Sequence, residues 1–469
     1  MQLDSPSGTG RHDGGPSAMP ALRLRPIACW SGLLASSLLA ACTPTEASPR
    51  SPAPPVLPAD VPVAAPDSLV CCTDGGWVTM SELQRRKLVA EDSLWERALA
   101  LHYDAVVLDG HMDTPTLALE EGYRFAERHT PLRGKHHVDL PRMREGGLDG
   151  GFFSIYVSSR FGEGEAATER ARAMLRTFRE QVDASDRAEV ALTADDVLRL
   201  ARKGTAAVLF GLEGGHALQA DPDVLRELYG LGIRYVTLTH VNTNRFADAS
   251  QSAPRWGGLN DTGRMLVEEM NRLGVLVDVS HTSDSTFFDA VQASRAPVIA
   301  SHSSARAIVN NVRNLSDEQL RVLGESGGVA MVNFFDPTVN RNFDADVMAA
   351  AYKRIDRDYG GNLRMIWKAA MDERYARGFP RGTVADVVAH IDHVARVAGV
   401  EHVGLGSDFD GAFSFPIGME DVTELPHVTY GLMKLGYTDA EIRGILGGNV
   451  LRALREAERV AAEMQASES

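Results

Sequence analysis

Residues 206–216 read AAVLFGLEGGH, a nearly unbroken apolar run that ends in Glu213, two glycines and His216. Such a run is typical of a strand that is buried on both faces of a parallel sheet. Similar runs occur at 105–108, 151–157, 234–239, 275–279, 297–300, 329–334 and 403–406, and helical stretches of mixed polarity separate them. These alternations favour an α/β fold, a closed (β/α)8 TIM-type barrel rather than an open doubly wound sheet. We expect residues 336–382 to form a helical insertion after strand seven.

The composition narrows the classes of function. The chain has 469 residues, and its 48 Lys and Arg against 63 Asp and Glu give a net charge of −15. This acidic balance argues against nucleic acid as a partner. Four cysteines without a CxxC pair exclude a disulfide-rich scaffold, so any metal site must use histidines and carboxylates. No GxGxxG or P-loop motif follows a predicted strand, which weakens the case for nucleotide binding.

The first 70 residues carry the features of a targeting segment and a tether. Two arginines precede an apolar stretch that ends in LAAC, which resembles a bacterial lipobox. We therefore expect residues 1–42 to be a signal peptide and Cys42 to be lipidated, and an ordinary cleaved signal is the alternative. Residues 43–70 are rich in Pro and Ala, as in an extended linker, and residues 71–465 then form the barrel domain.

Polar residues cluster where the predicted strands end. Because the carboxyl ends of barrel strands meet at one mouth, the usual face of an active site, these side chains can reach a common point. The candidates are Asp109, His111, Asp113, Glu213, His240, His281, His302 and Asp408.

His111 and Asp113 stand two residues apart, so in extended backbone both side chains point to one side and can bind one ion. Alone, this pair is weak evidence for a metal site, and a strand end with solvated polar residues is the more common interpretation. With Glu213, His281 and His302 it becomes a set of imidazole and carboxylate ligands that suits Zn²⁺. Three histidines and two carboxylates exceed the needs of one tetrahedral zinc, so the set predicts two ions bridged by Glu213. Such a pair would bind a water jointly and lower its pKa.

Three further residues have competing interpretations. Asp408 is either a sixth ligand or the group that moves a proton from the bridging water to the leaving amine. His240 is either a donor that polarises the substrate or a hydrogen-bonded strand-end histidine. Arg313 could clamp a substrate carboxylate bidentately, although its position alone is more typical of a surface arginine. We interpret Asp410 as a loop-capping carboxylate and His390 as part of a helix face.

Several stretches together resemble the membrane (renal-type) dipeptidase family, the zinc dipeptidases of the amidohydrolase-like barrels. They are DGHMD at 109–113, LEGGH at 212–216, YVTLTH at 235–240, LGVLVDVSH at 273–281, APVIASHSSA at 296–305, MVNFF at 331–335 and GSDFDG at 406–411. Two departures stand out: Met112 replaces a residue that is frequently polar in the family, and the insertion at 336–382 looks longer than in the mammalian relatives.

The resemblance implies a role for each candidate residue. His111 and Asp113 would bind one zinc ion, and His281 and His302 the other, with Glu213 as the bridge. His240 and Arg313 would bind the dipeptide, with Arg313 on its carboxylate, and Asp408 would handle the proton.

These observations together predict a periplasm-facing, lipid-anchored, binuclear zinc dipeptidase in the cell envelope. A metal-bridging hydroxide would attack the peptide carbonyl, and dipeptides with a C-terminal D-residue are among the candidate substrates. The resemblance also suggests a homodimer. The alternatives are another metal-dependent amidohydrolase, such as a deacylase or lactonase, and a non-catalytic lipoprotein that holds metal.

Overall fold

The computed structural model describes residues 87–468 except 91, 133 and 344–362. The chain divides into two units, residues 1–53 and 54–469, and every described residue lies in the second. The predicted signal peptide (1–42), its Cys42 and the predicted linker (43–70) therefore lie outside the described residues. The same holds for the first part of the predicted 71–465 domain.

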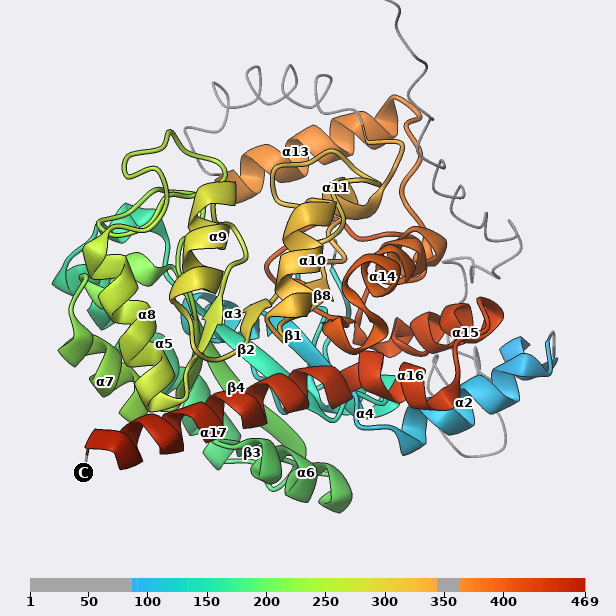
Figure 1. Ribbon diagram of the computed structural model, residues 1–469. Coiled ribbons are helices and arrows are strands. Elements are labelled where there is room, and N and C mark those ends of the chain that lie inside the picture. Colours follow the sequence, from blue (N-terminus) through green and yellow to red (C-terminus); the bar gives the residue numbers. More distant parts are fainter. Residues whose placement is uncertain (1–86, 91, 133, 344–362, 469) are drawn as a thin grey trace, which may run out of the picture. The chain divides into compact units, whose positions relative to one another are not determined.

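Eight parallel strands form the wall of a barrel, in the order in which they occur along the chain (Figure 1). They are β1 (Leu108–Met112), β2 (Gly150–Tyr156), β4 (Ala206–Glu213), β5 (Ile233–Thr237), β6 (Leu276–Asp278), β7 (Val298–Ala300), β8 (Val329–Val332) and β9 (Val403–Leu405). Each pairs with the next in parallel register. The predicted (β/α)8 barrel is thereby confirmed.

The first strand lies slightly later in the chain than its apolar run suggested, and one short strand was missed. The run at 105–108 shares Leu108 with β1, which extends over Leu108–Met112 and contains Asp109 and His111, the residues expected at its end. A ninth strand, β3 (Ala188–Val190), pairs with β4 outside the barrel path. It has only three residues, one buried, one exposed and one half-buried, which is too short a pattern to identify from sequence.

The barrel closes where β9 meets β1, through a short seam that lies beyond the end of β9. Met112 and Phe409 form an isolated parallel bridge, in which the Asp113 amide donates to the Phe409 carbonyl at 2.8 Å. The Asp408 amide donates to the His111 carbonyl at 3.0 Å, and the Ser407 amide donates to Asp109 Oδ1 at 2.9 Å. The seam therefore brings the two ends of the barrel sequence together at the mouth.

Helices surround the strands (Figure 1). They are α2 (Leu94–Asp104), α3 (Thr114–Glu121), α4 (Leu140–Gly146), α5 (Glu165–Asp183), α6 (Ala194–Lys203), α7 (Pro222–Gly230), α8 (Asp261–Leu273), α9 (Asp284–Ala293), α10 (Asp317–Glu325), α11 (Asp336–Val339), α13 (Leu363–Ala376), α14 (Val384–Ala398), α15 (Pro426–Lys434), α16 (Asp439–Arg443) and α17 (Asn449–Glu468). The capping box at Ser316 and Gln319 starts α10 as its sequence indicates. None of the described helices combines the length and the apolar character needed to cross a bilayer.

One end of the barrel is sealed by α17. Its Val450, Leu451 and Leu454 belong to one apolar cluster with residues near the beginnings of strands, among them Leu108 and Val329. This packing removes apolar surface from water at that end. The opposite mouth, where the strands end, is left for polar side chains.

Candidate metal centre and active site

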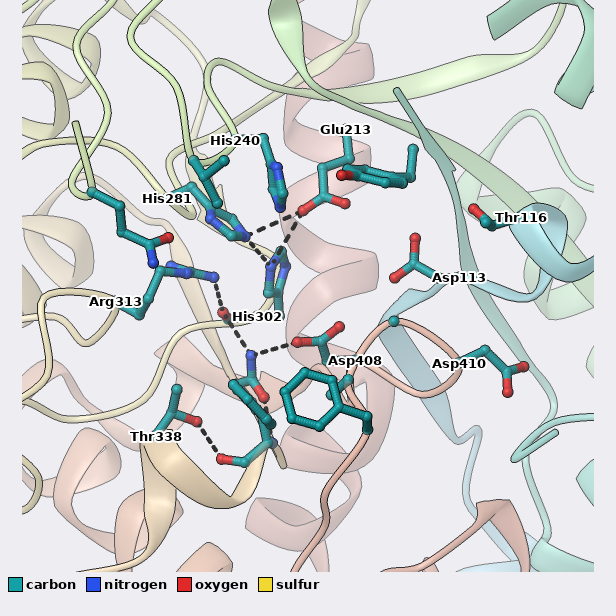
Figure 2. Close-up of a pocket in the computed structure, with 18 residues that line it drawn as sticks. Asp113, Thr116, Glu213, His240, His281, His302, Arg313, Thr338, Asp408 and Asp410 are labelled. Carbon is teal, nitrogen blue, oxygen red and sulfur yellow. Dashed lines mark hydrogen bonds and ion pairs between the residues drawn. The ribbon is translucent and has the colours of Figure 1, made fainter. Parts of the chain in front are cut away.

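The five predicted metal ligands lie together at the mouth of the barrel, with side chains that are at most 9% exposed. His111 Nε2 lies 3.2 Å from Asp113 Oδ2 and 3.5 Å from Glu213 Oε2. The other oxygen, Glu213 Oε1, lies 3.3 Å from His281 Nε2 and 3.5 Å from His302 Nε2 (Figure 2). One oxygen of Glu213 thus faces His111, the neighbour of Asp113, and the other faces His281 and His302, an arrangement that suits a bridging carboxylate.

The residues fit metal ions by the chemistry of their donors. His281 Nε2 and His302 Nε2 lie 2.9 Å apart, and burial lowers the pKa of both imidazoles well below the usual value, which keeps them neutral. Two lone pairs so close together are stabilised by a cation between them. His111 Nε2 and Asp113 Oδ1 are buried and have no hydrogen-bond partner among the described residues. Neutral imidazoles and carboxylates are the ligands of zinc and similar divalent ions.

Hydrogen bonds to Nδ1, the ring nitrogen that points away from Glu213, orient His302 and His111. The Ser301 hydroxyl donates to Asp278 Oδ2 at 2.6 Å and therefore accepts from His302 Nδ1 at 2.8 Å. This fixes the tautomer with the lone pair on Nε2, the atom that faces Glu213. The Tyr235 hydroxyl holds His111 Nδ1 at 2.7 Å. Such partners set ligand orientation in metal sites.

These orienting residues were missed by the sequence analysis. Tyr235 and Asp278 lie within β5 and β6 rather than after a strand end, so a search of strand ends passes over them. Their existence could have been predicted from chemistry alone, because a histidine that binds a metal through one ring nitrogen needs a hydrogen-bond partner for the other.

The loop after β9 approaches the carboxylates closely. Asp408 and Asp410 adopt left-handed backbone at φ 67° and 68°, a conformation that is uncommon for residues other than glycine. A Cβ atom on Gly411 would lie 2.2 Å from Asp113 Oδ2 and 2.5 Å from Asp408 Oδ1, so only glycine fits there. Strain of this kind is often found at functional sites.

Asp408 lies beside the predicted ligands and within reach of the same metal. It can share an ion with His111 and Asp113. The Asn333 amide donates to its Oδ2 at 3.1 Å, and burial raises its pKa to about 7. The geometry is compatible with both roles considered for Asp408, a ligand and a carrier of protons.

A pocket of about 240 Å³ opens beside this cluster, and both predicted substrate-binding residues line it (Figure 2). Arg313 donates through Nη2 to the His302 carbonyl at 3.2 Å, so it is not the surface residue that its position in the sequence suggested. Burial lowers its pKa to about 10, which leaves it cationic at neutral pH. His240 Nδ1 has no hydrogen-bond partner among the described residues, and burial lowers its pKa.

The residues assigned structural roles behave accordingly. Asp410 accepts from the Thr114 hydroxyl at 2.7 Å and from the His137 amide at 2.7 Å, as a loop-capping carboxylate does. His390 accepts from the Ala305 amide at 2.9 Å and is fully buried.

Comparisons with known proteins agree with this geometry. Residues 95–468 match the family model of membrane dipeptidases, peptidase family M19. The chain is 36% identical over 380 residues to the dipeptidase tcpJ of Claviceps purpurea, covering 79% of this chain and 77% of that protein. Among solved structures, the probable dipeptidase PvdM of Pseudomonas aeruginosa superposes with a TM-score of 0.70 at 25% identity, covering 79% of this chain and 99% of that one.

A second solved structure is a metallopeptidase of Rhodobacter sphaeroides, liganded with a phosphinate mimic of the dipeptide L-Ala-D-Ala. It has a TM-score of 0.62 at 28% identity and covers 75% of this chain and 99% of that one. Together these matches set aside the deacylase, lactonase and non-catalytic alternatives. The chain therefore belongs to the membrane dipeptidase family, peptidase family M19, and is a hydrolase of peptide bonds that acts on dipeptides.

Proposed function

We propose that this dipeptidase works with two Zn²⁺ ions, one held by His111 and Asp113 and the other by His281 and His302, with Glu213 shared. The observation that carries the proposal is the position of Glu213 between the other ligands, with Oε2 at 3.5 Å from His111 and Oε1 at 3.3 and 3.5 Å from His281 and His302. When bound, such ions supply the Lewis acidity that activates a water molecule and stabilises negative charge on the carbonyl oxygen.

The protein's own residues position the substrate in this proposal. Arg313 receives the C-terminal carboxylate, since a guanidinium that lines the pocket can bind both of its oxygens. His240 stands on the opposite side of the pocket from Asp408 and donates to the substrate carbonyl (Figure 2). Asp408, held by Asn333, gives a proton to the departing amine.

The proposed substrates are dipeptides with a free carboxylate, including those that end in a D-residue. The structure of the R. sphaeroides relative with a mimic of L-Ala-D-Ala supports this extension. We further propose that lipidated Cys42 anchors the enzyme at the periplasmic face of the cell envelope, where it could form a homodimer.

Metal analysis and a dipeptide panel test the proposal together. Purified enzyme should contain two zinc ions per chain, lose activity on chelation and regain it when zinc is returned. Unchanged turnover after complete removal of metal would refute it.

Asp408→Asn tests the proton step separately. The variant should keep its zinc and lose about 10²–10⁴-fold in kcat, the usual contribution of a positioned acid or base. A variant with wild-type kcat, or one that loses zinc, would exclude the assigned role.

A further inference from the structure

Two phenylalanines from distant parts of the chain form one wall of the pocket. Phe335 follows β8 and Phe413 follows β9, and both line the cavity. Their ring centroids lie 5.1 Å apart with the rings at 76°, an edge-to-face contact. We call this pair the aromatic wall. It forms an apolar side of a pocket that also contains the charged side chains of Asp113, Glu213, Arg313 and Asp408.

The insertion after β8 supports the aromatic wall from behind. Ile366, Ala370 and Met371 of α13 are buried in a small apolar cluster with Phe413, and Phe335 packs against the same cluster. This cluster is separate from the main core of the barrel. The wall is therefore backed by the insertion, and Phe335 also packs against the main core of the barrel.

Polar contacts fix the aromatic wall in place. Each phenylalanine directly precedes an anchoring residue, Asp336 or Ser414, and the Asp336 amide donates to the Ser414 carbonyl at 2.9 Å. The hydroxyl of Tyr375, on α13, lies 3.0 Å from Asp336 Oδ2 and 2.5 Å from Ser414 Oγ. A single hydroxyl thus connects both segments of the wall to the insertion.

Asp336 is itself held firmly. It is fully buried, and it accepts hydrogen bonds from the Gly382 amide at 2.6 Å and from Arg374 Nη1 at 3.4 Å. A buried carboxylate with this many donors has one stable orientation. The position of the neighbouring Phe335 is therefore well defined.

A hydrogen-bond network connects Arg313 to Asp408, and it indicates how a dipeptide lies relative to the aromatic wall. Arg313 Nη2 and Asn333 Nδ2 both donate to the His302 carbonyl, at 3.2 and 3.4 Å, and Asn333 Nδ2 also donates to Asp408 Oδ2 at 3.1 Å (Figure 2). The C-terminal residue of a dipeptide must extend along this network, because its carboxylate binds Arg313 and its nitrogen leaves beside Asp408.

Phe335 lies beside the same hydrogen-bond network. Its amide donates to Asn333 Oδ1 at 2.5 Å, and its carbonyl accepts from the hydroxyl of Thr338, another residue of the pocket, at 2.8 Å. With the carboxylate on Arg313 and the leaving nitrogen beside Asp408, as proposed above, the side chain of the C-terminal residue would face the aromatic wall and the N-terminal residue would lie toward the metal ligands.

We propose that the aromatic wall of Phe335 and Phe413 makes this dipeptidase prefer large apolar side chains at the C-terminal position, and that Tyr375 positions the wall. The inference rests on the proposed placement of Arg313 and Asp408. Burial of a large apolar side chain against two aromatic rings favours such substrates by about tenfold or more over glycine.

Two series of dipeptides test the preference. One series varies the C-terminal residue from Gly through Ala to Leu and Phe behind a constant N-terminal Ala, and the other varies the N-terminal residue before a constant Gly. Wild-type enzyme should show kcat/KM rising with size in the first series. Phe335→Ala and Phe413→Ala should lower kcat/KM for the C-terminal Leu and Phe substrates by about tenfold and so remove that rise. In the second series, the relative kcat/KM values of the different N-terminal residues should stay as in the wild type.

Tyr375→Phe tests the positioning role without removing a ring. It should raise KM for the Ala-Leu and Ala-Phe substrates with little change in kcat, and should leave Ala-Gly unaffected. Tyr437→Phe is the matched control, because its hydroxyl also donates to an aspartate, Asp392 at 3.0 Å, but lies outside the pocket lining. Equal effects of the two variants on every substrate would show general destabilisation and overturn the positioning role.

The outcomes separate this inference from the proposed function. If wild-type enzyme hydrolyses no dipeptide of either series, the proposed function fails. If it hydrolyses both series but shows no preference for C-terminal size, or if the phenylalanine variants keep that preference, only the aromatic-wall inference fails. If an alanine variant does not fold, Phe413→Leu replaces it in the test. Leucine preserves most of the apolar volume but removes the aromatic ring, so the preference for C-terminal size can still be measured.

Discussion

The two ring nitrogens of His111 have different partners, and the difference bears on metal affinity. Nε2 faces Asp113 and Glu213, whereas Nδ1 is held by the Tyr235 hydroxyl at 2.7 Å. A ligand held in this way loses less freedom when it binds a metal. The contribution of Tyr235 can be measured because one oxygen atom can be removed without changing the ring.

Tyr235→Phe should weaken zinc binding by about 10–100-fold, the usual effect of removing the partner of a ligating histidine. Competition with a chromogenic chelator measures the dissociation constant. Tyr229→Phe, which alters a tyrosine of α7 outside the pocket lining, should bind zinc like the wild type. Equal affinities of the Tyr235 variant and the wild type would show that the hydroxyl does not support the ligand.

Among single residues, the sequence predicted those that end strands and missed those that support them. His111, Glu213, His281 and His302 were found because a barrel brings the ends of its strands to one mouth. The position of Arg313 in the pocket was not predictable, since it depends on how the loop after β7 folds over the His302 carbonyl. Only the three-dimensional path of that loop distinguishes it from a surface arginine.

At the scale of elements, the packing of β4 against β5 depends on the absence of a side chain at Gly211 of β4. A Cβ atom at this position would lie 2.0–2.4 Å from the ring of Tyr235 on β5. The glycine therefore leaves room in the barrel interior for the tyrosine that supports His111. An alanine would push the ring away from its place.

Gly211→Ala should lower the free energy of unfolding by about 1–3 kcal/mol, the usual cost of overpacking a core, and should also weaken zinc binding. Gly230→Ala is the matched control. A Cβ atom there meets nothing within 4 Å, and replacing glycine in a helix should stabilise by about 0.5–1 kcal/mol. Chemical denaturation measures both, and a neutral or stabilising effect at position 211 would contradict the packing described.

Apolar runs were sufficient to predict seven strands approximately and placed β1 too early in the chain. That strand contains Asp109 and His111, which accept hydrogen bonds from the Ser407 and Asp408 amides just beyond β9. Polar residues inside a strand are paired by partners almost 300 positions away, and a local pattern cannot show them. The insertion was located correctly, but its role behind Phe335 and Phe413 depends on tertiary packing.

For the whole molecule, His390 of α14 makes stability depend on pH. Its Nδ1 accepts from the Ala305 amide at 2.9 Å and its Nε2 lies 3.2 Å from the Val339 carbonyl, so the neutral ring joins the segments that follow β7 and β8. Burial lowers its pKa to about 3. Because the unfolded chain binds a proton at about pH 6.5, this stabilisation is complete above that pH and is lost as the pH falls toward 3.

The difference in unfolding free energy between the wild type and His390→Asn should therefore shrink by up to about 1.4 kcal/mol per pH unit below pH 6.5. Urea denaturation between pH 7.5 and 4.5 measures it, and asparagine keeps an acceptor for the Ala305 amide. A difference that stays constant over this range would show that the histidine takes up its proton equally in both states.

The seam that joins β9 to β1 has a consequence for how the enzyme comes into being. A nascent chain already carries all five proposed zinc ligands when residue 302 leaves the ribosome, but the loop with Asp408 is translated much later. Ser407 and Asp408 then pair with Asp109 and His111 across 298 and 297 positions of sequence, respectively. The proposed set of metal ligands and proton carrier is therefore complete only after the segment beyond β9 has been made and has paired with β1.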